Sequence, residues 1–224
     1  YMLAMAYINR ASAYRHAGNP DPGPALSDLD RAVEILEQLN ASHPVPLAWR
    51  EALAQAYGSR ANMRKPARGE AYDPADHDRA ISVLEAIVNN LGDGTPPNVR
   101  NDLAGALSDR AIARPVSAAS LPFILADHDR SVKLREALVA EYGVNADPRW
   151  RRDLSISYKN RGGARNASPS HDQADALADY DRSIEIAEGV VASLGVGCLA
   201  NGSGALRPHI RHAPKCVTRC RHWA

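Results

Sequence analysis

The sequence predicts an all-α protein built from four stacked helical hairpins. The first observation is a pattern, Asp-x-Asp-Arg-(Ala/Ser)-(Val/Ile), that occurs four times at steps of 48, 51 and 52 residues. The second observation is another pattern that recurs in step with it. Self-similarity at such a period is the signature of a repeat architecture in which successive units pack on one another. The four copies of the first pattern cover residues 28–33, 76–81, 127–132 and 179–184.

The second pattern is Leu-(Ala/Ser)-x-(Ala/Ser)-(Tyr/Leu)-x-(Asn/Ser/Asp)-Arg-(Ala/Gly). Each repeat therefore has two segments, which we name segment A, with the arginine, and segment B, with the two aspartates. The copies of the second pattern cover residues 3–11, 53–61, 103–111 and 154–162.

Both segments have the periodicity of helices. In the first segment B, apolar residues recur every three or four positions from Leu26 to Leu39, which puts them on one helical face. Segment A is rich in alanine, and small residues let two helices approach closely. Glycine and proline separate the segments, and no alternating run is long enough for a strand. The predicted helices cover residues 1–17, 25–41, 47–65, 75–91, 97–114, 122–142, 148–165 and 173–194.

Composition divides the chain at about residue 195. Residues 1–195 form the predicted repeat domain, with repeats at about 1–46, 47–96, 97–147 and 148–195. Residues 196–224 have five basic residues, no acidic residue, and all three cysteines of the chain, so we expect a basic, irregular tail. Cys216 and Cys220 have three histidines nearby, but one loose cysteine pair does not match the paired spacing of zinc sites, and we predict no metal.

The repeat units resemble the tetratricopeptide repeat (TPR) family. Tyr7-Ile8-Asn9-Arg10-Ala11-Ser12-Ala13-Tyr14 is similar to the first helix of that repeat, and residues 176–184 are similar to its second helix. The openings at Trp49 and Trp150 resemble a bacterial variant with long helices. The resemblance covers residues 1–195, although the period near fifty exceeds the usual 34. It implies a right-handed α-solenoid of four antiparallel hairpins. Because the chain begins at Tyr1 and the counterpart of Trp49 would precede it, we expect a fragment of a longer protein.

The resemblance implies a non-catalytic module that binds a peptide or partner protein on its concave face. The A helices should line that face. We expect the groove to be polar and slightly basic, and therefore suited to an acidic ligand. The groove residues expected from the family's register are Ser12, Arg15, Gln55, Asn62, Lys65, Ser108, Lys159 and Asn166.

The repeated aspartates and histidines do not indicate an enzyme. Residues two apart on a helix point about 200° from each other, so one Asp-x-Asp pair cannot enclose a metal ion. His77 and His128 occupy the repeat position of Leu29 and Tyr180, which favours a packed side chain. We expect no catalytic residue and no cofactor. We also expect the A-segment arginines to pair with aspartates of the B helix that follows each of them, because a buried guanidinium needs a partner. These arginines are Arg10, Arg60, Arg110 and Arg161.

Several alternatives remain open at the level of sequence. The array could be the sensor or scaffold segment of a larger bacterial signalling protein whose catalytic domain lies elsewhere. It could also self-associate through an apolar strip on the C-terminal helix, or the tail around residues 199–210 could cover that strip. We expect a cytoplasmic protein without membrane contact, since no apolar run or signal peptide is visible, and we do not expect nucleic acid as a partner. The strip comprises Ile184, Ile186, Val190, Val191 and Leu194.

Overall fold

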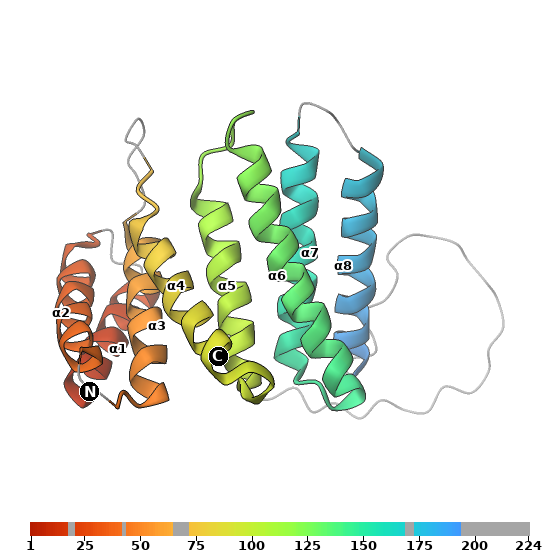
Figure 1. Ribbon diagram of the computed structural model, residues 1–224. Helices are drawn as coiled ribbons and strands as arrows, with labels where there is room; N and C mark the ends of the chain where they lie inside the picture. The colour runs from red at the N-terminus through yellow and green to blue at the C-terminus, as the bar shows by residue number, and fades with distance from the viewer. Residues whose placement is uncertain (18–20, 42–43, 65–71, 169–172, 194–224) are drawn as a thin grey trace, which may run out of the picture.

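The structure is a computed structural model that describes residues 1–17, 21–41, 44–64, 72–168 and 173–193. In these residues eight α-helices follow one another and no strand occurs. Figure 1 shows the hairpins side by side in chain order, with the α1–α2 hairpin at one end of the row and α8 at the other. Short 3₁₀ turns follow α4 and α6. The helices are α1 (Met2–His16), α2 (Gly23–Asn40), α3 (Leu47–Met63), α4 (Ala75–Leu91), α5 (Pro97–Ala113), α6 (Leu121–Tyr142), α7 (Pro148–Asn166) and α8 (Gln173–Ser193).

The eight predicted helices are confirmed, and their bounds differ from the predicted ones by no more than two residues. Punctuating residues explain this agreement. Proline lies in the first turn of α2, α5, α6 and α7, where its missing N–H costs no helical hydrogen bond. Gly92 and Gly143 directly follow α4 and α6 and cap them, and their φ angles of 53° and 51° suit glycine far better than other residues. Residues 65 and 194, at the predicted ends of the third and eighth helices, lie outside the described residues.

The helices are arranged in two layers. Each helix packs against the helix before it and the helix after it, as successive hairpins require. The odd-numbered helices, formed by the A segments, also contact one another in series from α1 to α7. Within the described residues the backbones of the even-numbered helices, formed by the B segments, do not approach one another in this way. The odd-numbered layer is therefore the more tightly spaced of the two.

The core repeats one arrangement at successive boundaries between repeats. In each case a β-branched residue of an even-numbered helix packs with two large side chains of the next odd-numbered helix. Burying such side chains is the main source of stability for the stack. The groups are Val33 with Leu53 and Tyr57, Ile81 with Leu103 and Leu107, and Val132 with Leu154 and Tyr158.

The predicted ion pairs between segments A and B are confirmed in all four repeats. Each arginine makes two parallel hydrogen bonds to the first aspartate of its own Asp-x-Asp pair, and this bidentate geometry is strong and directional. The Nε–Oδ2 and Nη2–Oδ1 distances are 2.7 and 2.6 Å for Arg10–Asp28, 2.7 and 2.6 Å for Arg60–Asp76, 2.8 and 2.6 Å for Arg110–Asp127, and 3.0 and 2.6 Å for Arg161–Asp179.

The second aspartate of each of the first three pairs has a different partner, which the sequence did not reveal. It accepts a hydrogen bond from the remaining Nη1 group of the arginine in the next repeat. The two aspartates of one motif thus bind two arginines, and the ion pairs form a continuous ladder through the stack. The Nη1–Oδ1 distances are 3.0 Å for Arg60–Asp30, 2.7 Å for Arg110–Asp78 and 3.0 Å for Arg161–Asp129.

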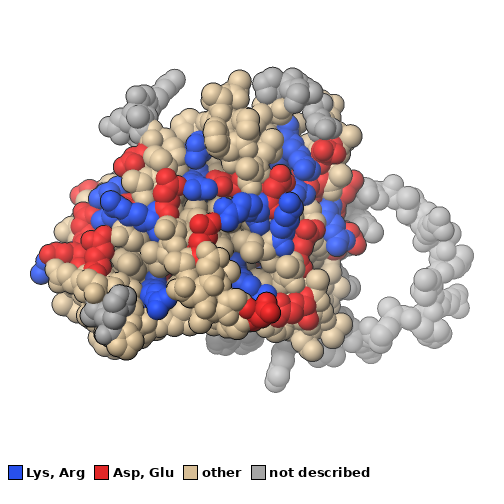
Figure 2. All heavy atoms as spheres, viewed as in Figure 1, with Lys and Arg blue, Asp and Glu red and all other residues tan. Residues whose placement is uncertain are grey.

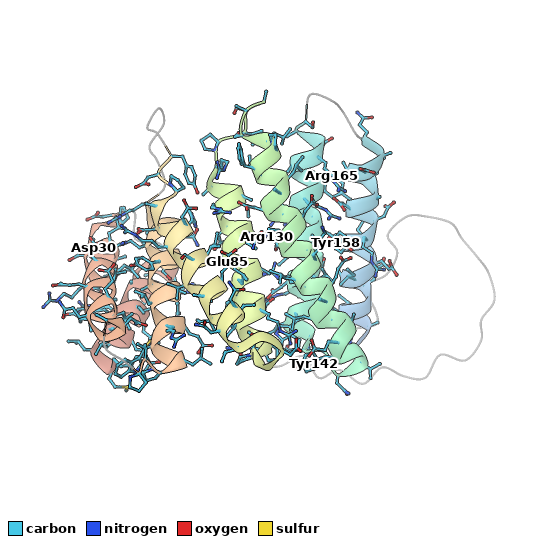
Figure 3. The ribbon with its side chains drawn as sticks, in the orientation of Figure 1. Asp30, Glu85, Arg130, Tyr142, Tyr158 and Arg165 are labelled. Atoms are coloured by element: carbon cyan, nitrogen blue, oxygen red, sulfur yellow. The ribbon has the colours of Figure 1, made fainter. Side chains whose placement is uncertain are left out.

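Further charged side chains surround this ladder on the visible surface. Figure 2 shows basic and acidic groups interleaved in a band that crosses the molecule. Figure 3 shows Arg130 of α6 beside Glu85 of α4, and their Nη2–Oε1 distance is 2.5 Å. Because both side chains are exposed, this pair contributes less than about 1 kcal/mol.

The two histidines between paired aspartates are packed inside the hairpins, as their repeat position predicts. Both His77 and His128 are buried. Burial disfavours the charged imidazolium and lowers the pKa of each below the ordinary value of 6.5. They therefore fill the position that Leu29 fills in the first repeat.

Candidate functional site

A cavity of about 550 Å³ opens on the side of the odd-numbered helices, and it is the candidate site. Helices α3 and α5 supply most of its lining, α1 and α4 contribute a few residues, and Arg135 reaches it from α6. Alanine and glycine on α3 and α5 leave this space, because small side chains do not fill the groove between adjacent helices. The polar lining consists mainly of carboxylates and side-chain amides.

Three carboxylates line the cavity. Glu51 Oε1 accepts a hydrogen bond from Asn98 Nδ2 at 2.9 Å, and Asp109 Oδ2 accepts one from Asn62 Nδ2 at 2.9 Å. Asp102 has no hydrogen-bond or ion-pair partner among the described residues. Its carboxylate is therefore available to a ligand.

The environment of Asp102 disfavours its charged form. The residue is open to solvent, but protein surrounds it on several sides of the cavity. This partial loss of hydration raises the pKa of Asp102 to about 6, and the negative charge of Glu51 adds to the effect. Asp102 therefore gains or loses its negative charge within the pH range where most proteins remain folded.

Arg135 is a buried cation beside these carboxylates, with only 6% of its surface exposed. Its Nε donates to Asn101 Oδ1 at 3.0 Å, and its Nη1 donates to the carbonyl of Asp153 at 3.2 Å and to Ser157 Oγ. Within the described residues it forms no direct ion pair. Burial lowers the pKa of Arg135, although arginine stays protonated under ordinary conditions.

Gly105 leaves the remaining Nη2 group of Arg135 accessible from the cavity. A Cβ atom at position 105 would lie 3.6 Å from Nη2, so a longer side chain would fill the space in front of the guanidinium. The cavity thus presents three carboxylates and one guanidinium. This arrangement can bind cations and hydrogen-bond donors, with Arg135 as a single site for an anionic group. The lining has no histidine, cysteine or lysine in the described part of the chain.

The structure brings only some of the predicted groove residues together. Gln55 and Asn62 line the cavity, and Arg15 joins Asn62 at an adjacent cavity of about 510 Å³. Ser108 is buried and accepts a hydrogen bond from Asn160 at 3.4 Å. The other predicted residues are elsewhere: Ser12, Lys159 and Asn166 are in described helices but do not line these two cavities, and Lys65 lies outside the described residues.

All four charged residues of the lining were missed by the sequence reasoning. A comparison of equivalent repeat positions contains the clearest signal for Arg135 and Asp109. Arg135 occupies the position of Leu36 and Leu84, so it places a charge where two other repeats bury a leucine. Likewise, Asp109 takes the position of Asn9, Ser59 and Asn160. Asp102 replaces Met2 and Ala52 of the first two repeats, but the fourth repeat also has an aspartate there, Asp153. Departures from the repeat pattern mark the residues that packing alone does not require.

In the described helices, no group of three or more histidine, cysteine, aspartate or glutamate residues has the arrangement of a metal site. The cysteines and histidines of the tail lie outside the described residues. None of the described helices combines the length and apolar character needed to cross a membrane. No family model, curated protein or solved structure matches this chain with significance.

Proposed function

We propose that this chain is a non-catalytic binding module that holds a segment of a partner protein on its odd-numbered helices. We further propose that its hairpins form a right-handed solenoid of the tetratricopeptide type. The closer spacing of the odd-numbered layer supports a curved array with those helices inside, because the inner side of a curved stack is shorter. The cavity on that side carries the proposal, since it is lined by polar side chains that the core does not use.

The ligand we propose is a basic segment, in place of the acidic one expected from the sequence alone. Glu51, Asp102 and Asp109 outnumber the single cation Arg135 in the cavity. Lysine or arginine of a bound segment would pair with these carboxylates, and the side-chain amides would bind its backbone. Such a ligand gains most from Asp102, whose carboxylate has no hydrogen-bond partner among the described residues.

A peptide-selection experiment tests this function. The protein and a triple variant, Glu51→Gln with Asp102→Asn and Asp109→Asn, would each select from a library of random peptides. We expect the wild type to enrich lysine and arginine, and the variant to bind the enriched peptides at least tenfold more weakly, a loss of about 1.4 kcal/mol. The matched control replaces three exposed carboxylates outside the cavity, as Glu34→Gln, Asp93→Asn and Glu185→Gln. Equal selection by all three proteins would contradict the proposal.

Binding is expected to depend on pH through Asp102. Above its pKa of about 6 the carboxylate is charged and attracts a cation, whereas below it the neutral acid does not. We therefore expect the affinity for a selected basic peptide to fall about tenfold between pH 7.5 and pH 5. The peptide's binding to Asp102→Asn should be weak and nearly independent of pH over this range. Isothermal titration calorimetry at both pH values measures these affinities. If the affinity of the variant fell with pH as steeply as that of the wild type, Asp102 would be excluded as the titrating group.

The raised pKa of Asp102 also affects the stability of the fold. The folded-state pKa of about 6 lies above the ordinary value of 3.8, so the folded state binds the proton more tightly. The contribution of Asp102 to stability therefore decreases as the pH rises from about 4 to about 6. Asp102→Asn should melt at a higher temperature than the wild type at pH 7.5, and this difference should vanish near pH 4. Thermal unfolding at the two pH values measures it.

A further inference from the structure

The first and last helices each present a face that their counterparts bury. Helix α1 belongs to the hairpin at one end of the row, and α8 lies at the other end (Figure 1). Ile184 of α8 is 56% exposed, whereas its counterparts Val33, Ile81 and Val132 are at most 3% exposed. In those three cases the next odd-numbered helix covers the side chain. The same face of α8 also exposes Leu177 and Val191, which lie seven residues on either side of Ile184.

Two acidic groups accompany this apolar stripe on α8. Asp181 is the counterpart of the three second aspartates that accept a hydrogen bond from the next repeat's arginine. Glu188 is the counterpart of Glu37 and Glu136, which accept hydrogen bonds from Tyr57 and Tyr158 of the next odd-numbered helix. Neither Asp181 nor Glu188 has a partner within the described residues. The position of Asp181 therefore accepts from a following A helix in all three inner junctions, and the position of Glu188 does so in two; the third counterpart, Glu85, pairs with Arg130 of α6.

Helix α1 presents the complementary set. Leu3 is 57% exposed, whereas its counterparts Leu53, Leu103 and Leu154 are at most 6% exposed. Tyr7 is the counterpart of the two tyrosines that donate to glutamate. Arg10 binds Asp28 through Nε and Nη2, and its Nη1 has no acceptor in the described part of the chain. In every later repeat this Nη1 binds the preceding repeat's second aspartate.

We propose that copies of this chain associate head to tail, with α1 of one copy on α8 of the next. Arg10 Nη1 of one copy then binds Asp181 of the other and extends the ion-pair ladder across the junction. Tyr7 donates to Glu188, and Leu3 covers Ile184. The interface reproduces the packing already present between successive repeats of one chain. Because it joins two different surfaces, it leaves a free α1 and a free α8 at the ends and does not close at two copies.

Charge complementarity indicates that α1 of another copy, and not a second α8, covers the exposed face of α8. Two α8 helices packed face to face would bring Asp181 and Glu188 against the same acidic groups, and like charges without a cation repel. Helix α1 instead brings the arginine that the counterparts of Asp181 bind in all three inner junctions. It also brings the tyrosine that the counterparts of Glu188 bind in two of them. The inference concerns the ends of the array and does not depend on the cavity or its ligand.

The test uses the full chain with one end blocked at a time. Ile184→Lys blocks the α8 end and Leu3→Glu blocks the α1 end, and both sites are exposed, so each variant should keep the circular dichroism and melting temperature of the wild type. In sedimentation velocity, we expect the wild-type coefficient to rise with concentration and each variant alone to stay at the monomer value. An equimolar mixture of the two variants should form a dimer that grows no further, because each retains one different intact end.

A charge exchange provides an independent measurement. The Asp181→Arg variant should not self-associate, like the Ile184→Lys variant, because its new arginine would repel Arg10 of the next copy. Three outcomes would overturn the proposal. The wild type could remain monomeric at every concentration, the Leu3→Glu variant could still associate through α8 alone, or the mixture of blocked variants could contain monomers only.

Discussion

Replacing Arg60 with alanine is expected to lower the free energy of unfolding by about 3 kcal/mol. Arg60 is 8% exposed and makes two hydrogen bonds to the buried Asp76 and a third to Asp30. Removing one partner of a buried ion pair leaves the other charge without compensation, which typically costs about 3–5 kcal/mol. We expect the lower end of this range, because Arg64 also lies 3.2 Å from Asp76 and retains part of the compensation.

Urea unfolding followed by circular dichroism measures this change. The control is Arg31→Ala, which removes an exposed pair with Glu34 in α2 and should cost less than about 1 kcal/mol. Asp30→Ala should also cost about 1 kcal/mol or less, since Asp30 is about half exposed and water can replace it. Similar losses for Arg60→Ala and Arg31→Ala would mean that the ladder contributes no more than surface charges do.

The difference between the two aspartates shows how far the sequence could predict this fold. The first aspartate and its arginine belong to one hairpin, so the pairing follows from two helices that the repeat pattern already defines. The second aspartate pairs with the next hairpin, and the distance from Asp30 to Arg60 depends on how successive hairpins are placed. Helical periodicity describes one helix at a time, and it contains no information on that placement.

The candidate cavity was less predictable for a related reason. The sequence reasoning used positions that the resemblance to a family assigned to the groove, and two of them, Gln55 and Asn62, do line the cavity. The cavity also depends on Arg135, which comes from an even-numbered helix and passes between neighbours to reach the odd-numbered side. A rule that assigns the groove to A segments alone cannot include it. The feature of the sequence that marks Arg135 is its replacement of a leucine that other repeats bury.

Replacing Gly162 with valine is expected to be nearly as damaging as the loss of Arg60, although it removes no interaction. The other three repeats have alanine here, at Ala11, Ala61 and Ala111. In the fourth repeat a Cβ atom would lie 3.1 Å from the carbonyl oxygen of Ala176 and 3.2 Å from Cε1 of Tyr180. These distances are tighter than ordinary van der Waals contact. Helices α7 and α8 therefore pack so closely here that a Cβ atom at position 162 would require its neighbours to shift by a few tenths of an ångström.

The size of Tyr180 explains why glycine occupies this position. Tyr180 corresponds to Leu29 in the first repeat and to a histidine in the second and third. We infer that the largest side chain at one position is matched by the smallest at the other. Gly162→Val should cost about 2–3 kcal/mol by overpacking. Gly162→Ala should cost about 1 kcal/mol, because the higher helix propensity of alanine offsets part of the clash.

Urea unfolding of a double-mutant series separates the clash from propensity. In a Tyr180→Leu background, which restores the alanine–leucine combination of the first repeat, Gly162→Ala should become neutral or stabilising. The control is Gly189→Ala on α8, where an added Cβ meets nothing within 4 Å and the gain in propensity, up to about 1 kcal/mol, stands alone. If Gly162→Ala costs the same with tyrosine and with leucine at position 180, the carbonyl of Ala176 and the Cβ atom of Asp179 set the limit, and positions 162 and 180 are not matched in size.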